Sequence, residues 1–489
     1  MLLKETKSLC PICRKVLDAE ITEEDGKVWI TRTCPDHGEA KNLYWSDAEM
    51  YRRFDAYEAI GAGVLNPQKD AGAEACPGAC GLCSNHHSGT LLANIDLTNR
   101  CNLNCDFCFA NARACGFIYE PEFDEVIGMM AMLREEKPVP PPAVQFSGGE
   151  PTMRDDLPEI VWKAKEMGFS QVQIATNGIK LAKDIKYVQE LKDVGLSTVY
   201  LHFDGVTRET NPILPTSLKA VENCKEIGLG VVLVPTIING RNDHEVGAIL
   251  KYAAEHVEVV RGVNFQPVAF TGAASEDDIR RERVTIPDLT ERIEEQTEGV
   301  IKKDYFYPVP CVIPISDLVE TYTGKPQVRF TTHQHCGAAT YVFVEDDKLM
   351  PINEMVDVDK FFEAIDRMAV KMQNGGTINK YMSLLEGVKE MSASASKGEV
   401  NGTKLWKLLG EALVFQNFDA LRDFHWNAIF IGTMHFMDNF NYDLERVQRC
   451  CIHYTTPDGR MIPFCTYNSG PVYREEVWKK FAQPLEKKE

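Results

Sequence analysis

The sequence lacks any long hydrophobic run. No stretch approaches the ~20 apolar residues that a membrane-spanning helix needs, and the late apolar segment 427–434 is too short to cross. The first residues, Met-Leu-Leu-Lys-Glu-Thr-Lys, lack the apolar core of a signal peptide. We therefore expect a cytoplasmic protein without a transmembrane segment, with peripheral contact to the membrane as the only alternative.

A surplus of positive charge is also missing. The 53 lysine and arginine residues are outnumbered by 72 aspartate and glutamate residues, and the formal net charge is −19. A nucleic-acid partner would favour a basic face, so we expect none. The same balance disfavours simple electrostatic docking to an anionic membrane surface.

Cysteine, in contrast, is abundant, with 16 residues. In such a chain this number indicates metal ligation rather than disulfides. Cys101, Cys105 and Cys108 have the spacing Cys-x3-Cys-x2-Cys, and the aromatic Phe107 precedes the last of them. Three thiolates can hold three irons of a [4Fe–4S] cluster and leave the fourth iron without a protein ligand. A zinc knuckle or an ordinary ferredoxin loop is the alternative interpretation.

This motif resembles that of the radical S-adenosylmethionine (SAM) enzymes, in which the amino and carboxylate groups of SAM chelate the open iron. The resemblance implies cleavage of SAM to methionine and a 5′-deoxyadenosyl radical, and it makes Phe107 a cofactor-binding residue. Gly148, Gly149 and Glu150 follow an apolar run at 143–146 that is typical of a strand. In the superfamily a Gly-Gly-Glu segment here binds the SAM ammonium, and a carboxylate can accept such a hydrogen bond.

Strand-like runs alternate with amphipathic helical stretches over residues 91–275, which predicts a parallel sheet with right-handed crossovers. The expected strands are 91–97, 143–146, 171–175, 198–203, 231–234 and 263–266. Six such units match the partial (β/α)6 barrel of radical SAM enzymes, an α/β fold. Functional groups on such barrels lie at the carboxyl ends of the strands. The candidates there for SAM contact are Asn177, Asp204, Thr236 and Gln266, although each could instead serve a turn or cap a strand.

Residues 1–90 are interpreted as a Cys-rich metal-binding region with two cysteine groups. The first resembles a zinc ribbon or rubredoxin knuckle, with His37 available as a fourth ligand. Its cysteines are Cys10, Cys13 and Cys34. The second group repeats the spacing of the SAM motif and consists of Cys76, Cys80 and Cys83.

Residues 276–489 are expected to form a mostly helical domain that binds an auxiliary cluster and lines a substrate channel. Its group of three is Cys311, Cys336 and Cys465. The fourth ligands of the three auxiliary sites would come from Cys115, Cys450 and Cys451, which leaves Cys224 as a free thiol. The alternative is that several of these cysteines are free.

Over its whole length the chain resembles the archaeal tetraether lipid synthases and the related class D radical SAM methylases. The matching stretches are 10–13 with 34–38, 76–83, 101–110, and 450–451 with 462–465. The resemblance implies a SAM cluster, two auxiliary [4Fe–4S] clusters and one mononuclear iron or zinc. It also implies an electron donor such as ferredoxin or flavodoxin.

The resemblance to the synthase implies a carbon–carbon bond between the termini of phytanyl chains of archaeal ether lipids. Such a substrate requires a long apolar channel, for which 414–421 and 424–440 are candidate walls. No side chain is singled out as a catalyst, because cofactors carry the chemistry. Two alternatives stay open. One is a radical SAM C-methylase that acts on an unactivated carbon of a pterin-type substrate in a smaller, more polar pocket. The other is a non-catalytic electron carrier.

Overall fold

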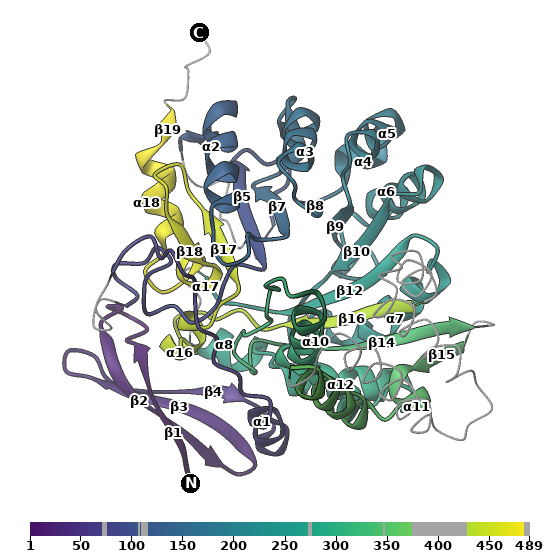
Figure 1. Ribbon diagram of the computed structural model, residues 1–489. Helices are drawn as coiled ribbons and strands as arrows, with labels where there is room; N and C mark the ends of the chain where they lie inside the picture. The colour runs from purple at the N-terminus through teal and green to yellow at the C-terminus, as the bar shows by residue number, and fades with distance from the viewer. Residues whose placement is uncertain are drawn as a thin grey trace.

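The computed structural model describes residues 1–70, 76–105, 108, 116–271, 276–345, 348–373 and 428–483 (Figure 1). Within these residues there are three sheets: a four-stranded sheet at the N-terminus, a 13-stranded sheet through the centre, and a small pair, β6 (Ile118–Tyr119) with β19 (Ala482–Gln483). The central sheet carries the candidate site, so its order matters most for function.

Six parallel strands form the middle of the central sheet. They are β5 (Leu92–Thr98), β7 (Ala143–Gly148), β8 (Gln171–Thr176), β9 (Thr198–His202), β10 (Gly230–Val234) and β12 (Val260–Pro267). They pair in this order, each parallel to the next. These are the six strands that the sequence predicted, and the α/β fold is confirmed.

Helices connect these strands and cover the outer face of the curved sheet (Figure 1). They are α2 (Phe123–Arg134), α3 (Leu157–Glu166), α4 (Ile179–Lys183), α5 (Ile185–Asp193), α6 (Leu214–Ile227) and α7 (Val246–Glu255). Local chemistry sets their ends. The Asp184 carboxylate accepts hydrogen bonds from the backbone N–H groups of Lys186 and Tyr187 where α5 begins. Gly228 ends α6 at a φ of 73°, a conformation that suits glycine.

Segments after residue 276 extend this sheet at both edges. β16 (Ala428–Met434) pairs parallel to β12, and β17 (Ile452–Thr455) pairs parallel to β5. The other strands there are β13 (Tyr307–Pro308), β14 (Gly337–Glu345), β15 (Lys348–Pro351) and β18 (Met461–Pro463). The sequence predicted a mostly helical region here and did not single out these strands. A short apolar run such as 428–434 does not by itself distinguish a strand from a buried helix. The boundaries after residues 90 and 275 stay predictions.

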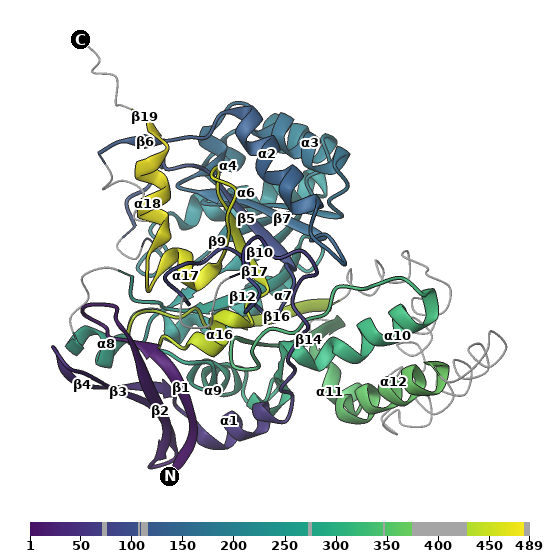
Figure 2. The ribbon, with the colours of Figure 1, turned by 60° about the vertical axis from the view of Figure 1, so that its left-hand side comes forward.

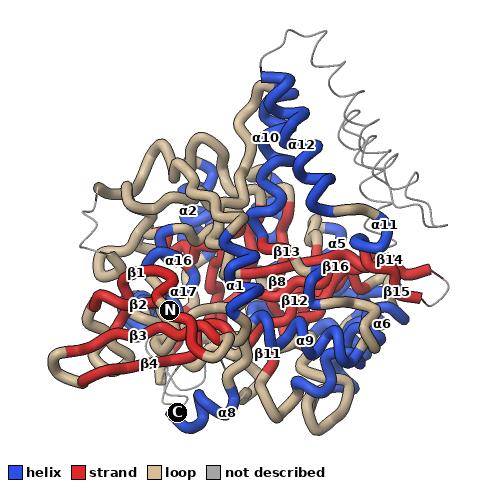
Figure 3. The backbone as a smooth tube through the Cα atoms, turned by 90° about the horizontal axis from the view of Figure 1, so that it is seen from below, coloured by secondary structure: helices blue, strands red, loops and turns tan. Residues whose placement is uncertain are grey.

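The helices of this C-terminal part lie between and beside those strands. They are α8 (Glu276–Glu282), α9 (Ile286–Gln296), α10 (Ile313–Thr323), α11 (Ile352–Met355), α12 (Val358–Gln373), α16 (Leu444–Gln448), α17 (Phe464–Asn468) and α18 (Tyr473–Lys480). Helices α10 and α12 pack side by side and project away from the sheet (Figure 3). Among the described residues, no helix is both long and apolar enough to cross a membrane.

The N-terminal sheet is an antiparallel meander that rests on the segment 437–447 near α16 (Figure 2). Its strands are β1 (Leu2–Leu9), β2 (Val16–Glu24), β3 (Lys27–Cys34) and β4 (Gly38–Trp45), followed by α1 (Ala48–Asp55). Thr6 and Tyr44 donate from their hydroxyls to the Asp443 carboxylate at 2.7 and 2.8 Å. The Ser8 hydroxyl donates to the Tyr442 carbonyl at 2.5 Å. These bonds tie the first strands to a segment far along the chain.

Candidate active site and metal centres

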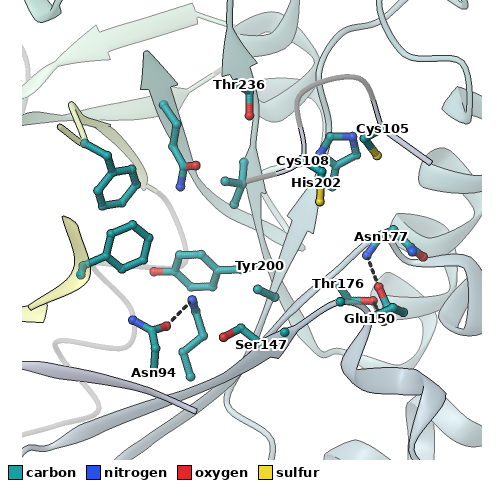
Figure 4. Close-up of a pocket in the computed structure, with 18 of the residues that line it drawn as sticks. Asn94, Cys105, Cys108, Ser147, Glu150, Thr176, Asn177, Tyr200, His202 and Thr236 are labelled. Carbon is teal, nitrogen blue, oxygen red and sulfur yellow. Dashed lines mark hydrogen bonds between the residues drawn. The ribbon is translucent and has the colours of Figure 1, made fainter. Parts of the chain in front are cut away.

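A cavity of about 340 Å³ opens at the carboxyl ends of the parallel strands (Figure 4). The three cysteines of the first motif reach it, as do the Gly-Gly-Glu segment and three of the four further candidates. The sequence-predicted residues in its wall are Cys101, Cys105, Cys108, Gly148, Gly149, Glu150, Asn177, Thr236 and Gln266. Phe107 and Cys115 lie outside the described residues. The fold thus brings together groups from six strand ends.

The cysteine donors suit an iron–sulfur cluster with an open iron. Cys101, Cys105 and Cys108 come from one loop after β5, and all three line the same cavity. Three thiolates facing one space can hold three irons of a cube, and the fourth iron then faces the cavity. The donor set therefore fits the group that the spacing predicted.

Gly148 and Gly149 allow two strand ends to approach each other closely. A Cβ at Gly148, where φ is +129°, would lie 2.2 Å from the Thr98 carbonyl oxygen, and one at Gly149 would lie 2.3 Å from that of Arg100. The backbone N–H of Gly149 donates to the Thr98 carbonyl at 2.6 Å, and that of Glu150 to the Arg100 carbonyl at 2.8 Å. The glycines thereby hold the residues that lead into the Cys101 loop, besides lining the cavity.

Glu150 presents a fixed, buried carboxylate to the cavity. One oxygen accepts from the Thr152 and Thr176 hydroxyls at 2.5 and 2.6 Å, and the other accepts from the Asn177 backbone N–H at 2.8 Å. Burial raises the pKa of this carboxyl, and the hydrogen bonds oppose that effect. A buried carboxylate held in place in this way can accept a hydrogen bond from a cationic ammonium group.

Asn177 forms the turn and lines the cavity, and its contact with SAM stays a prediction. Its amide oxygen accepts from the Ile179 backbone N–H at 3.0 Å, as in an Asx turn, while its amide nitrogen donates to Asn102 at 2.7 Å in the cysteine loop. Asp204 is not among the residues lining the cavity. Its carboxylate accepts from the Thr236 backbone N–H at 2.9 Å and lies 3.0 Å from His202 Nε2. Asp204 thus acts on two residues that do line the cavity.

Several lining residues were missed by sequence reasoning. They are polar side chains inside the strands and groups from the C-terminal part: Asn94, Gln145, Tyr200, His202, Asn264, Phe464 and Arg474. Burial alone would lower the pKa of His202, but the Asp204 carboxylate outweighs it, and the pKa is raised. Polar residues at alternate positions of otherwise apolar strands were the available signal.

The first N-terminal cysteine group forms a compact metal centre. The ligand atoms of Cys10, Cys13, Cys34 and His37 all lie within 4.8 Å of one another. With Zn–S bonds of about 2.3 Å, tetrahedral sulfur ligands stand roughly 3.8 Å apart. The Cys13 and Cys34 sulfurs are 3.9 Å apart, and His37 Nδ1 is 3.5 Å from Cys34 Sγ. His37 completes the set, so no distant cysteine is needed there.

Burial and neighbouring charges affect the thiol pKa of several of the remaining cysteines. Burial raises the pKa of Cys80, and the charges of Cys76 and Cys83 add to this effect. In the C-terminal part, the charge of Cys336 acts on the thiols of Cys450, Cys451 and Cys465. Burial and the charge of Asp359 raise the pKa of Cys311, and its predicted place beside Cys336 and Cys465 stays a prediction. Cys224 is buried inside α6.

Models of two protein families match the chain. That of the radical SAM superfamily matches residues 95–253, and that of the HMPTM N-terminal zinc ribbon domain matches residues 2–46. SAM, a [4Fe–4S] cluster and an additional metal site in the ribbon are therefore the cofactors of this protein. The matching families thus require the same cofactors as the cysteine loop and the ribbon indicate.

Two curated proteins resemble this chain, over different shares of its length. The 7,8-dihydro-6-hydroxymethylpterin dimethyltransferase of Methanocaldococcus jannaschii is 50% identical over 497 aligned positions, covering 99% of this chain and 96% of that protein. The Fe-coproporphyrin III synthase of Methanosarcina barkeri is 35% identical over 187 positions, covering 37% of this chain and 44% of that protein. The second match is confined to less than half of either chain.

The first match contradicts the expected resemblance to a tetraether lipid synthase, and with it the carbon–carbon bond between lipid termini. The cysteine groups that suggested the synthase fix the cofactors, and they are shared by enzymes with different substrates. The cavity wall also carries polar side chains, unlike the wholly apolar channel that phytanyl chains would need. Of the expected walls, 414–421 and 424–427 lie outside the described residues, whereas Met434 and Phe436 from the remainder line the cavity. The chain is a radical SAM enzyme and belongs to the family of the 7,8-dihydro-6-hydroxymethylpterin dimethyltransferase.

Proposed function

We propose that this enzyme is a radical SAM methyltransferase that methylates an unactivated carbon of a dihydropterin. The activity of the relative that is 50% identical over nearly the whole chain carries the proposal. The polar side chains set into a largely apolar cavity wall support it, because a pterin is a flat ring bordered by hydrogen-bond donors and acceptors. Recognition of such a ring needs fixed polar partners within a partly apolar pocket.

A row of amides along three neighbouring strands supplies such partners. Gln173 donates to the Gln145 amide oxygen at 2.8 Å, and Gln145 in turn donates to that of Asn94 at 2.8 Å. The Asn94 amide nitrogen is buried and has no partner within the structure. Because a buried donor without a partner costs free energy, a ligand acceptor at this place would be bound strongly. A carbonyl or ring nitrogen of the pterin fits this donor.

Aromatic side chains offer a stacking surface on the C-terminal side of the cavity. The rings of Phe436 and Phe464 are stacked with their centroids 4.1 Å apart, and both line the cavity. Tyr200 lies in the wall near Asn94 in Figure 4. A flat heterocycle can stack on such rings while its edge bonds to the amides.

The residues near the cysteine loop would hold the second ligand. SAM bound to the open iron would supply the radical that removes hydrogen from an unactivated carbon, and a second one-carbon donor, such as another SAM molecule, would supply the methyl group. Glu150 is positioned to accept from the ammonium group of the iron-bound SAM, and Thr236 and Gln266 line the same cavity on the neighbouring strands. An electron donor such as ferredoxin or flavodoxin would supply the electron for each cleavage.

The direct test uses anaerobic enzyme with SAM, a strong reductant and 7,8-dihydro-6-hydroxymethylpterin. We expect deoxyadenosine together with a pterin whose mass has risen by one and then two methyl groups. An archaeal diether lipid serves as the comparison substrate. Recovery of unmethylated pterin while the lipid is consumed would contradict the proposal.

Asn94→Asp tests the pterin contact specifically. The carboxylate can still accept from Gln145 but cannot donate, so we expect kcat/KM for the pterin to fall roughly 10- to 100-fold, as for the loss of ~1–3 kcal/mol. Deoxyadenosine formation without pterin should persist. Gln189→Glu makes a similar exchange on the exposed face of α5 and should change neither quantity.

A further inference from the structure

Arg446 is a buried cation without a carboxylate partner. Its side chain is 1% exposed, and among the described residues no carboxylate oxygen lies within 4.0 Å of its guanidinium. The neighbouring arginines of this part of the chain differ: Arg449 pairs with Glu58 at 2.9 Å and Arg474 with Asp96 at 3.2 Å. A buried charge is costly unless an opposite charge lies beside it.

The groups that do surround Arg446 are cysteine sulfurs. Its Nε donates to Cys336 Sγ at 3.3 Å, one Nη donates to the His435 carbonyl at 2.6 Å, and the other Nη is buried with no partner. Cys336 and Cys465 both act to raise the pKa of this guanidinium. The buried cation therefore faces a site whose natural occupant is anionic.

Three cysteines meet at this place from distant parts of the sequence. The Cys336 carbonyl accepts from the His435 backbone N–H at 2.9 Å, and the charge of Cys336 acts on the thiols of both Cys450 and Cys465. Cys465 Sγ also accepts from the Met437 backbone N–H at 3.3 Å.

The spacing of these sulfurs favours a cluster over a single ion. Among the described residues, only the N-terminal ribbon brings three or more metal-binding atoms within 4.8 Å of one another. Sulfur ligands of a four-iron cube stand farther apart than those of one ion. Three thiolates on such a cube carry a net negative charge, which balances the charge of Arg446.

We propose that Arg446 is the buried counter-cation of an anionic iron–sulfur cluster held by Cys336, Cys450 and Cys465, and that it raises the reduction potential of this cluster. Reduction adds one electron and makes the cluster more negative, so a neighbouring positive charge stabilises the reduced form. A protein sets the reduction potential of such a cluster through the net charge around it and through hydrogen bonds to its sulfurs. The proposal concerns this cluster and does not depend on which substrate is methylated.

Arg32 offers a matched control within the same chain. It is also buried, at 2% exposed, and no ion pair joins it to a carboxylate in the part of the chain that the structure describes. Its guanidinium instead donates to three backbone carbonyls, those of Leu9, Ile30 and Asn439. Its charge is thus held by the backbone rather than by the C-terminal cysteines.

The test is an anaerobic redox titration followed by electron paramagnetic resonance, with iron counted per chain. It uses the full-length protein in which Cys101, Cys105 and Cys108 are alanine, so that the SAM cluster does not contribute. In this background Cys336→Ala should lose the iron of one cluster and one reducible signal. We expect Arg446→Met to move that same signal to a more negative potential, Arg446→Lys to restore most of the shift, and Arg32→Met to leave it in place.

Each contrary outcome bears on the proposal directly. Full iron content in Cys336→Ala, or an unshifted signal in Arg446→Met, would overturn it. Equal shifts in the methionine and lysine variants, loss of the iron in both, or an equal shift in Arg32→Met would also overturn it, because charge would then not be the cause. Loss of the cluster in Arg446→Met alone, with retention in Arg446→Lys, would support it.

Discussion

The N-terminal ribbon and the cavity of the central sheet use cysteine in two different ways. In the ribbon, Cys10, Cys13, Cys34 and His37 surround one point and can complete the coordination of an ion. In the cavity, the three cysteines of one loop share the wall with Glu150 and leave room beside them. A closed ligand set is typical of a structural metal, and an open position is typical of a reactive one. Completeness of coordination, more than the cysteine count, separates the two.

The largest effect is expected at the open site. Cys105→Ala removes one of the three thiolates that the cube needs, so deoxyadenosine formation from SAM should fall to background. The metal content of the ribbon should stay unchanged, which would show that the two sites are independent. Cys224→Ala, which removes a buried thiol of α6, should keep both properties; wild-type deoxyadenosine formation in Cys105→Ala would reject the cluster assignment.

Glu150→Gln should weaken the open site without emptying it. Removal of the negative charge costs a charge-assisted hydrogen bond to the SAM ammonium, worth about 1.5–3 kcal/mol, so the Kd for SAM should rise about 10- to 100-fold. Equilibrium binding to the reconstituted protein measures it. Glu190→Gln on the exposed face of α5 is the control, and equal Kd values in both variants would remove Glu150 from the binding site.

Cys34→Ala should break the closed site and spare the open one. Loss of one of four ligands should release the metal, and the melting temperature should fall by several degrees because the ribbon is held together by that ion. Metal analysis and calorimetry measure the two effects. SAM cleavage per intact cluster should persist, and its complete loss would mean that the ribbon metal takes part in the reaction.

The smallest effect concerns His202 beside the open site. Asp204→Asn removes the carboxylate that raises the His202 pKa, so that pKa should fall in the variant, as NMR titration can measure. A raised pKa in the folded state adds stability below the unfolded value, and this stability is lost as the pH rises through the folded value. The variant should therefore be less stable than the wild type by about 1 kcal/mol or less near pH 5, the side chain being one-third exposed. The difference should vanish in alkaline solution, and a constant difference would point to another cause.

The sequence predicted the parts of the fold that depend on local pattern. The six parallel strands are short apolar runs separated by amphipathic helices, so the period of the hydrophobic pattern is enough to locate them in the sequence. The ribbon was recognisable because Cys10 and Cys13 are neighbours in the chain. Among the described residues, the candidate cofactor residues apart from Asp204 line one cavity, because parallel strands end at one edge.

What the sequence could not give depends on contacts between distant segments. Cys336 precedes β14, Cys450 precedes β17 and Cys465 lies in α17, so only the folded sheet relates them. The sequence grouped Cys336 and Cys465 with Cys311 and left Cys450 among the candidates for a fourth ligand, and these groupings stay predictions. The amides of Asn94, Gln145 and Gln173 counted as ordinary strand residues, although they lie in register and form one row. The substrate also depends on such wall residues, whereas the cysteine motifs report only the cofactors.

The hydrogen bonds from Thr6, Ser8 and Tyr44 to the segment 442–443 give the ribbon a further consequence. Tyr44 also lies with its ring 5.8 Å from the Arg446 guanidinium. The ribbon thus covers the buried guanidinium of Arg446. In a variant that lacks residues 1–46, this region would be open to water and dioxygen. We expect the iron–sulfur absorption of this variant to bleach faster in air, before any change in its overall fold is detected.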